Sequence, residues 1–247
     1  MKNIAIIGLG NMGKSIYERL CVYSEFKVVG CEKGDDINNL IEKCDIFVIA
    51  IKPQDFAEMA KEIKTDLKNK IVISIMAGVS IKKIKDTLKI KKIVRVMPNL
   101  PLKAGMALSG WIASKDLSFT EKNIIREILK SFGKEIEVSN EEKINAITAI
   151  SGSGPAYFYY LVEVLQSVAK KYGFNEKEAQ KLAEVCFIGS SNLLMQENIS
   201  AKELRQKVTS KGGTTEAAIT SMQKNKLEKI VLDAVDCAFK RAKELNN

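Results

Sequence analysis

The first half of the chain alternates between short apolar runs and stretches whose apolar residues recur at helical spacing. The apolar runs, rich in Ile and Val, predict buried strands over residues 4–7, 27–31, 46–51, 71–75 and 93–96. Helical spacing follows the first strand over about residues 11–22, and Pro53 suits the first turn of a helix after the third strand. Strands that alternate with helices indicate βαβ units and a parallel sheet, which residues 106–113 and 136–138 extend.

The second half, from about Glu141 onward, has a helical pattern throughout. It predicts helices over residues 155–172, 176–196, 201–208, 214–223 and 227–244. Two of these helices are apolar around much of their circumference, so we expect them to bury part of that surface against a second subunit. The sequence therefore predicts an α/β fold, with a doubly wound sheet in domain 1–141 and an all-α dimerisation domain over 142–247.

A glycine-rich turn, Gly8-Leu9-Gly10-Asn11-Met12-Gly13, lies between the first predicted strand and the first predicted helix. In that context Gly8 makes a tight turn, Gly10 lets a ligand approach the backbone, and Gly13 permits close packing of helix on strand. The first N–H groups of a helix attract anions, so the turn suits the pyrophosphate of a dinucleotide. We therefore predict a Rossmann-type domain that binds NAD(P), with a tight turn that binds no ligand as the alternative.

The residue at the end of the second predicted strand is the one that discriminates between the two nicotinamide coenzymes, NADH and NADPH. Glu32 stands where an acid would bind the ribose 2′-hydroxyl and repel a 2′-phosphate, which favours NADH. Lys33 beside it argues for NADPH, because an ammonium group there can hold a phosphate. The sequence thus leaves NADH and NADPH open, with a slight preference for NADH. In the alternative interpretation both side chains are solvent-facing turn residues.

A second turn, over residues 208–215, is rich in glycine and hydroxyl groups and opens a later predicted helix. Gly212 and Gly213 permit conformations in which successive N–H groups converge, and the helix that follows adds its positive end. Such a turn suits a small carboxylate, although an ordinary N-capped loop has the same pattern. Together the two turns predict a nicotinamide enzyme that acts on a small substrate carrying a carboxylate.

The amino-acid composition limits which catalytic groups and which kinds of site the protein can have. The sequence contains no His, which excludes a Ser-His-Asp triad and leaves proton transfer to other groups. Its five cysteines are scattered and form no CxxC pair, so we expect a reducing cytoplasm, no disulfide framework and no metal site.

The net charge is +9, but few of the basic residues are Arg, so we expect a solvated lysine-rich surface and no nucleic-acid partner. The longest uncharged run, 144–162, contains glycines and Pro155, so we expect no membrane segment.

With these motifs the sequence resembles the pyrroline-5-carboxylate reductase family over nearly its whole length. The resemblance is carried by segments 8–13, 50–53, 77–80, 95–99, 151–157, 203–205 and 208–215. It implies an NAD(P)H-dependent oxidoreductase that reduces the cyclic imine 1-pyrroline-5-carboxylate to L-proline, the last step of proline biosynthesis. It also implies a homodimer formed through the C-terminal helices, which can assemble into a larger ring such as a decamer.

The resemblance also assigns roles to residues. It places the substrate carboxylate on the backbone amides of a turn that comprises Ser210, Gly212, Gly213, Thr214 and Thr215. It makes Thr215 the catalytic residue, hydrogen-bonded to the ring nitrogen. It places the nicotinamide end of the coenzyme beside Ala50, Ile51, Lys52, Pro53 and Ala77. Lys52 is either a positioning cation or the end of a strand, and Asn99 either reaches the nicotinamide or caps the next turn.

Three departures from the family pattern are visible. The segment between Glu32 and Asp45 is shorter than usual, Leu100 replaces a common threonine, and Lys211 replaces the usual proline of the substrate turn. Because the glycines of that turn and Thr215 are intact, the predicted activity stands. The alternatives are a related Rossmann dehydrogenase acting on another cyclic imine or a β-hydroxyacid, and a non-catalytic NAD(P)-sensing protein.

Overall fold

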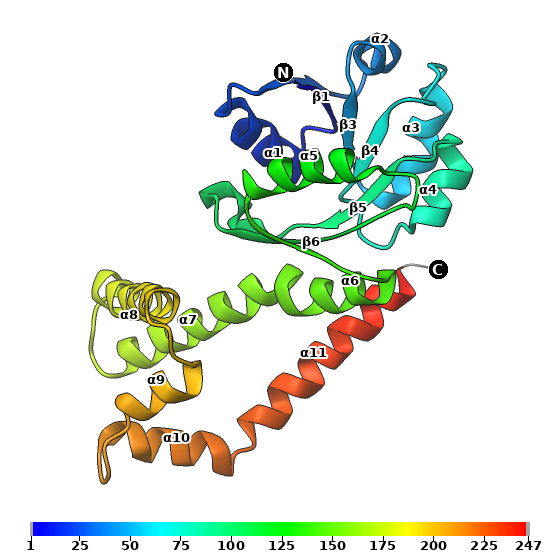
Figure 1. Ribbon diagram of the computed structural model, residues 1–247. Coiled ribbons are helices and arrows are strands. Elements are labelled where there is room, and N and C mark those ends of the chain that lie inside the picture. The colour runs from blue at the N-terminus through cyan, green and yellow to red at the C-terminus, as the bar shows by residue number, and fades with distance from the viewer. Residues whose placement is uncertain (1, 246–247) are drawn as a thin grey trace. The chain divides into compact units, whose positions relative to one another are not determined.

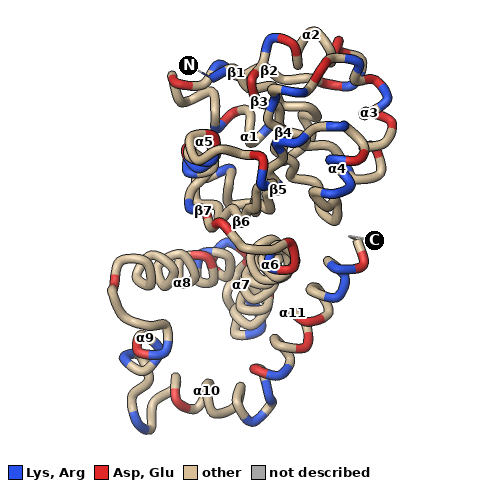
Figure 2. Tube along the Cα trace, turned by 45° about the vertical axis from the view of Figure 1, so that its right-hand side comes forward, with Lys and Arg blue, Asp and Glu red and all other residues tan. Residues whose placement is uncertain are grey.

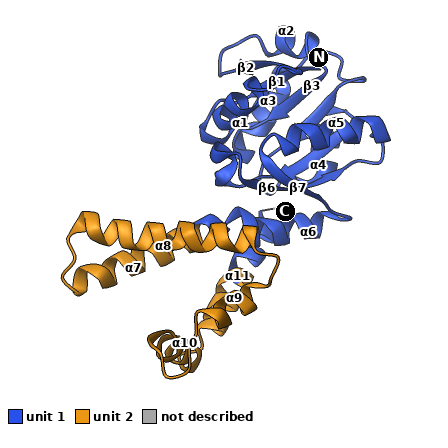
Figure 3. Ribbon diagram, turned by 60° about the vertical axis from the view of Figure 1, so that its left-hand side comes forward, with its two compact units in different colours: residues 1–155, 237–247 blue, residues 156–236 orange. Residues whose placement is uncertain are grey.

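The computed structural model describes residues 2–245, which fold into two compact units (Figure 3). The first unit comprises Met1–Pro155 together with Cys237–Asn247, and the second comprises Ala156–Asp236. The end of the last helix therefore belongs to the same unit as the sheet.

The first unit is built on a seven-stranded sheet with the order β2-β1-β3-β4-β5-β6-β7 (Figure 1). Its strands are β1 (Lys2–Ile7), β2 (Phe26–Cys31), β3 (Ile46–Ile49), β4 (Ile71–Ser74), β5 (Ile93–Met97), β6 (Ala107–Ala113) and β7 (Gly133–Glu137). Every neighbouring pair is parallel except β5 and β6, which are antiparallel. The strand order reverses at β1, because β2 and β3 lie on its two sides. Sheets of this kind bind ligands beyond the carboxyl ends of the strands at such a point.

Helices cover both faces of this sheet, which explains its continuous apolar strands. On one face α1 (Asn11–Cys21) and α5 (Phe119–Lys130) pack onto the sheet, and the other face carries α2 (Ile37–Glu42), α3 (Phe56–Glu62) and α4 (Ile81–Leu88). Strands covered on both faces have no contact with water and therefore consist of apolar residues throughout. In β3, for example, all residues are apolar and buried. The predicted α/β class with a parallel sheet is confirmed.

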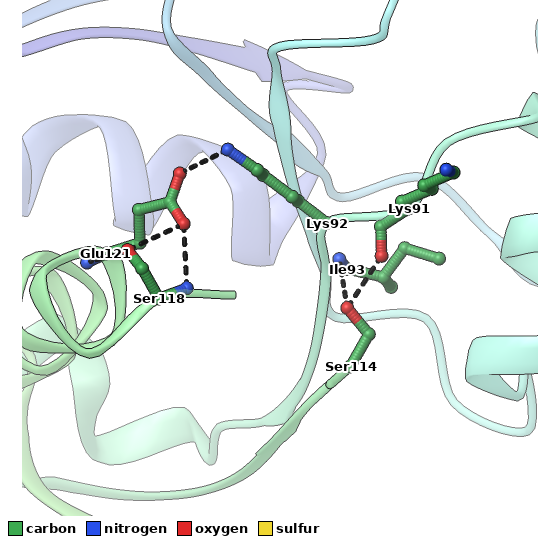
Figure 4. Close-up of polar contacts among 6 residues, drawn as sticks. All are labelled: Lys91, Lys92, Ile93, Ser114, Ser118 and Glu121. Atoms are coloured by element: carbon green, nitrogen blue, oxygen red, sulfur yellow. Dashed lines mark hydrogen bonds and ion pairs between the residues drawn. The ribbon is translucent and has the colours of Figure 1, made fainter. Parts of the chain in front are cut away.

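Polar contacts join the N-terminus of α5 to the residue just before β5 (Figure 4). Ser118 caps α5 in a capping box with Glu121, and the Glu121 carboxylate accepts a hydrogen bond from Lys92 Nζ at 2.6 Å. Partial burial by itself would raise the pKa of the Glu121 carboxyl. The hydrogen bonds from Lys92 and Ser118 outweigh this effect, so that the pKa is lowered. Close by, the Ser114 hydroxyl donates to the Lys91 carbonyl at 2.6 Å and accepts from the Ile93 N–H at 3.1 Å. These contacts fix the antiparallel β6 beside β5.

The remaining helices follow the sheet. They are α6 (Glu141–Ile147), a π-helix (Thr148–Gly152), α7 (Gly154–Lys171), α8 (Glu176–Gln196), α9 (Ala201–Lys207), α10 (Thr214–Lys224) and α11 (Leu227–Glu244). Two short 3₁₀ helices, η1 (Pro53–Asp55) and η2 (Leu100–Ala104), follow β3 and β5. The helices predicted from the periodicity of the second half are confirmed, with ends that lie close to the expected positions.

Within the second unit, α7 and α8 pack against each other but leave much apolar surface exposed. Ala179 and Ala183 of α8 are buried, and the rings of Phe158 and Phe187 lie 5.6 Å apart. Exposed large apolar side chains on these two helices include Tyr160, Leu161, Val164, Leu165, Val168, Leu182, Val185, Ile188, Leu193 and Leu194. An exposed apolar surface of this extent is typical of a protein–protein interface.

Acidic and basic residues are interspersed along the chain in both units (Figure 2). Among the described helices, none combines the length and the apolar composition that crossing a bilayer requires.

Candidate functional site

The turn between β1 and α1 presents backbone amides at the carboxyl edge of the sheet. Gly8 has a φ of +93°, which favours glycine, and its N–H donates to the Cys31 carbonyl at 2.9 Å. Gly10 is the N-cap of α1, and no side chain caps this helix. The first N–H groups of an α-helix have no partner within the helix, so those of α1 suit an anion.

The three glycines of this turn differ in their surroundings. A Cβ atom on Gly13 would overlap the Gly8 carbonyl oxygen and stand 3.1 Å from the Ala50 Cβ, so α1 can lie against the sheet only if residue 13 lacks a side chain. A Cβ on Gly8 would stand 2.7 Å from Ile51 Cγ2. A Cβ on Gly10, in contrast, would meet no atom of the described residues within 4 Å. Packing therefore requires glycine at 8 and 13, whereas a side chain at residue 10 would meet open space.

A cavity of about 520 Å³ lies beside this turn, a volume in the usual range of small-molecule sites. Six residues that the sequence assigns to the coenzyme line it: Gly8, Leu9, Gly10, Glu32, Lys33 and Ile51. The rest of its lining consists of Ile7, Cys31, Asp35, Ile37, Asp55, Glu58, Met59 and Glu62. Eight further residues assigned to the coenzyme are not part of the lining: Asn11, Met12, Gly13, Ala50, Lys52, Pro53, Ala77 and Asn99.

The cavity wall is strongly acidic, which the sequence analysis missed. Its carboxylates belong to Glu32, Asp35, Asp55, Glu58 and Glu62, against the single ammonium group of Lys33. The last three follow one another at the i, i+3 and i+7 spacing of one helix face, a signal that the sequence does contain. Asp35 is held at the end of β2, because its carboxylate accepts a hydrogen bond from the Glu32 N–H at 2.7 Å.

The negative charge of this wall acts on the thiol of Cys31, which also lines the cavity. Burial raises the pKa of its thiol, and the nearby charges of Asp35, Glu62 and Asp36 raise it further, to about 11. Lys33 offsets this field little, because its Nζ lies 3.8 Å from Glu58 Oε1 and both side chains are largely exposed. The cavity wall therefore carries a net negative charge.

Most of the residues predicted beside the nicotinamide lie at the same edge of the sheet, just after β3 and β4. Ala50 follows β3, and its N–H donates to the Ile7 carbonyl at 2.8 Å. Lys52 is exposed and is the N-cap of η1, with Pro53 in the first turn, so it lies beyond the end of the strand. Ala77 precedes Gly78, whose φ of +73° sets the turn after β4. These positions are compatible with a ligand that extends along the edge from the glycine turn.

Asn99 has a structural role that neither sequence alternative described. Its side chain makes no capping hydrogen bond with η2, so the expectation that it caps the next turn is wrong. Instead its Nδ2 donates to both the carbonyl and the hydroxyl of Ser151 at 3.1 Å, and its Oδ1 accepts from the Leu108 N–H at 3.1 Å. Asn99 thereby joins the end of β5 to β6 and to the π-helix. Its contact with the nicotinamide stays a prediction.

The second predicted anion site is the turn that leads from α9 into α10. Gly212 has a φ of +74°, and the Gly213 N–H donates to the Ser210 carbonyl at 3.0 Å. Gly213 is the N-cap of α10 and carries no capping side chain, so the first amides of this helix also suit an anion. Thr214 and Thr215 open the helix, the first exposed and the second half-buried.

The carboxylate of Glu216, in the first turn of α10, accepts a hydrogen bond from the Gly212 N–H at 2.7 Å. The sequence analysis did not identify this residue. Among the described residues, no group of three or more acidic or Cys side chains is placed to hold a metal ion. The structure thus offers two amide-rich turns and one acidic cavity as candidate ligand sites.

Comparisons with known proteins agree with this arrangement. Residues 141–245 match a family model described as pyrroline-5-carboxylate reductase dimerisation, and residues 36–78 match one described as NADP oxidoreductase, coenzyme F420-dependent. The chain is 33% identical to a pyrroline-5-carboxylate reductase of Vibrio alginolyticus, over 99% of this chain and 97% of the relative.

Two solved structures are similar over their full length. A pyrroline-5-carboxylate reductase from Coxiella burnetii is 30% identical, with a TM-score of 0.88 over 100% of this chain and 99% of the other. A pyrroline carboxylate reductase from Plasmodium falciparum, solved with NADP bound, is 27% identical, with a TM-score of 0.90 over 100% of this chain and 98% of the other.

Proposed function

Because this chain belongs to the pyrroline-5-carboxylate reductase family, we propose that it catalyses the NAD(P)H-dependent reduction of 1-pyrroline-5-carboxylate to L-proline. One observation carries the proposal. The chain combines a glycine turn beside a cavity of about 520 Å³ with a second glycine turn, at the start of α10, that no side chain of its N-cap residue caps. The first suits the pyrophosphate of the coenzyme, and the second suits the carboxylate of the substrate.

The proposed reaction demands little acid–base chemistry from the protein. When bound, the reduced coenzyme supplies a hydride to the imine carbon, and the protonated imine nitrogen becomes the amine of proline. A protonated imine is already electrophilic, so the lack of His is no obstacle. We assign carboxylate binding to the turn that comprises Ser210, Gly212, Gly213 and Thr214, with Thr215 hydrogen-bonded to the ring nitrogen. The protein then acts chiefly by holding the two reactants in register.

The activity test is the loss of absorbance of the reduced nicotinamide when purified protein is mixed with the imine and each coenzyme. The six-membered cyclic imine and a β-hydroxyacid with oxidised coenzyme serve as competing substrates. Faster turnover of either would point to a related dehydrogenase. Coenzyme binding without any imine-dependent oxidation would point to a sensing protein.

We expect Thr215→Val to lower kcat/KM by about tenfold to a hundredfold. The substitution removes one hydrogen bond to a charged group, which contributes roughly 1.5–3 kcal/mol to transition-state binding. Steady-state kinetics with the imine measures the effect, and Thr220→Val, which alters an exposed threonine later in the same helix, is the control. Kinetics that stay unchanged in the Thr215 variant would remove this residue from the site.

We also propose that the coenzyme is NADH in preference to NADPH, because the acidic cavity would repel a 2′-phosphate. Lys33 and the NADP-bound relative argue in the opposite direction. Removing the charge of Glu32 by substitution with Ala is expected to shift the ratio of kcat/KM values toward NADPH by about two- to fivefold, a modest effect because the side chain is exposed. Glu25→Ala, at an exposed acid outside the cavity lining, is the matched control. A ratio that stays the same in the Glu32 variant would make this acid a bystander.

For the assembly, we propose a homodimer formed through the helices of residues 142–247, with residues 1–141 as the coenzyme domain. The exposed apolar faces of α7 and α8 and the match to a dimerisation model support this proposal. Assembly of dimers into a ring such as a decamer is compatible with it, and light scattering distinguishes the two. We further propose a cytoplasmic location, which suits five cysteines that are all free thiols.

A further inference from the structure

A carboxylate of the chain itself occupies the turn that we assign to the substrate carboxylate. Glu216 Oε2 lies 2.7 Å from the backbone nitrogen of Gly212 and accepts its hydrogen bond. The neighbouring Gly213 amide donates to the Ser210 carbonyl at 3.0 Å. The Gly212 amide is therefore bound by the same chemical group that the substrate carries.

This contact differs from the capping boxes found elsewhere in the chain. In α5, α8 and α9, the Glu at the third helical position accepts a hydrogen bond from the N–H of the N-cap residue itself, at 2.9, 2.9 and 2.7 Å. Those N-caps are Ser118, Asn175 and Ser200, whose side chains complete the box. In α10 the N-cap is Gly213, which has no side chain, and Glu216 reaches past it to Gly212. Capping of the ordinary kind therefore does not account for the position of Glu216.

We propose that Glu216 is an internal competitor of the substrate: it holds the Gly212 amide in the free protein and is displaced when the substrate carboxylate binds. This inference rests on the proposed function. One N–H makes one strong hydrogen bond, so two carboxylates compete for it, and like charges at this separation repel each other. Glu216 thereby sets the KM for the imine above the value that the turn would give without it.

The test compares the KM values of two imines in wild-type protein and in Glu216→Gln and Glu216→Ala. For 1-pyrroline-5-carboxylate we expect KM to fall by about three- to fivefold in both variants, the range for removing one partly exposed charge. For 1-pyrroline, which has no carboxylate to compete, KM should stay at the wild-type value. Glu228→Gln removes the same charge from the first turn of α11 and is expected to change neither KM.

Two results would overturn the inference. A KM for the carboxylate substrate that is unchanged or higher in both variants would show that Glu216 only stabilises the turn. An equal fall for both imines would show an effect unrelated to the carboxylate. Calorimetric titration of L-proline into the same proteins gives the comparison without turnover, with tighter binding expected in both variants. A protein that turned over no imine would thus count against the proposed function alone.

Discussion

Replacing Gly13 with Ala is expected to unfold the start of α1 and to abolish coenzyme binding. The added Cβ would overlap the Gly8 carbonyl oxygen, which belongs to the backbone and cannot rotate away, so α1 must move off the sheet. Forced overpacking of this kind costs about 3 kcal/mol of unfolding free energy. Because we propose that the amides of the same turn bind the pyrophosphate, the coenzyme Kd should rise by at least about a hundredfold, the factor that 3 kcal/mol corresponds to.

Gly10→Ala separates packing from ligand binding and is the matched variant. Gly10 has a φ of −64°, which any residue adopts, and its Cβ would point into open space. We therefore expect an unfolding free energy close to that of the wild type, together with a weaker coenzyme affinity because the new methyl group occupies the place of the pyrophosphate. Fluorescence titration with NADH and with NADPH measures the affinity. A Gly10 variant that binds both coenzymes normally would place the pyrophosphate elsewhere.

The second large effect is expected at Glu141, where substitution by Ala should lower the unfolding free energy by roughly 2–4 kcal/mol. Arg95 on β5 is buried, with a side chain 3% exposed, and its Nη1 lies 2.7 Å from Glu141 Oε1. The same oxygen accepts the Ile81 N–H at the start of α4, at 3.1 Å. The Glu141 side chain is 33% exposed. Removing it takes one partner from the buried Arg95 guanidinium and the acceptor from the Ile81 N–H, which costs more than losing a surface pair.

The neighbouring Glu142 provides the control. It pairs with Lys243 Nζ at 3.1 Å, but both side chains are more than half exposed, so Glu142→Ala should cost about 1 kcal/mol or less. Urea unfolding followed by circular dichroism compares the two variants. Equal losses in both would mean that the Arg95–Glu141 pair contributes no more than a surface contact does.

The local parts of the proposed coenzyme site were predictable from the sequence. Gly8, Gly10 and Gly13 follow a buried strand and open a helix, and this spacing alone anticipates their three different environments. Glu32 and Lys33 were expected at the end of β2 and do line the cavity. The acids of η1 and α3 were missed although their helical spacing was visible, because spacing shows that residues share a face and not what that face adjoins.

Contacts between distant segments could not be read from a single sequence. For Asn99 the sequence left two alternatives, contact with the nicotinamide or capping of the next turn. Its side chain bonds to Ser151, whose position depends on how the π-helix packs against the sheet. Glu216 was overlooked because its role depends on the positive φ of Gly212 and on the direction of α10.

The sequence by itself determined the α/β class, the two glycine turns and the family, because these follow from local periodicity and from motifs a few residues long. Only the tertiary structure decided that β6 runs antiparallel to β5, that five carboxylates line the cavity beside the first glycine turn, and that Arg95 pairs with Glu141. The physical reason is that strand pairing and helix packing bring together residues far apart in the chain. Their mutual charge and burial exist only after that packing has formed.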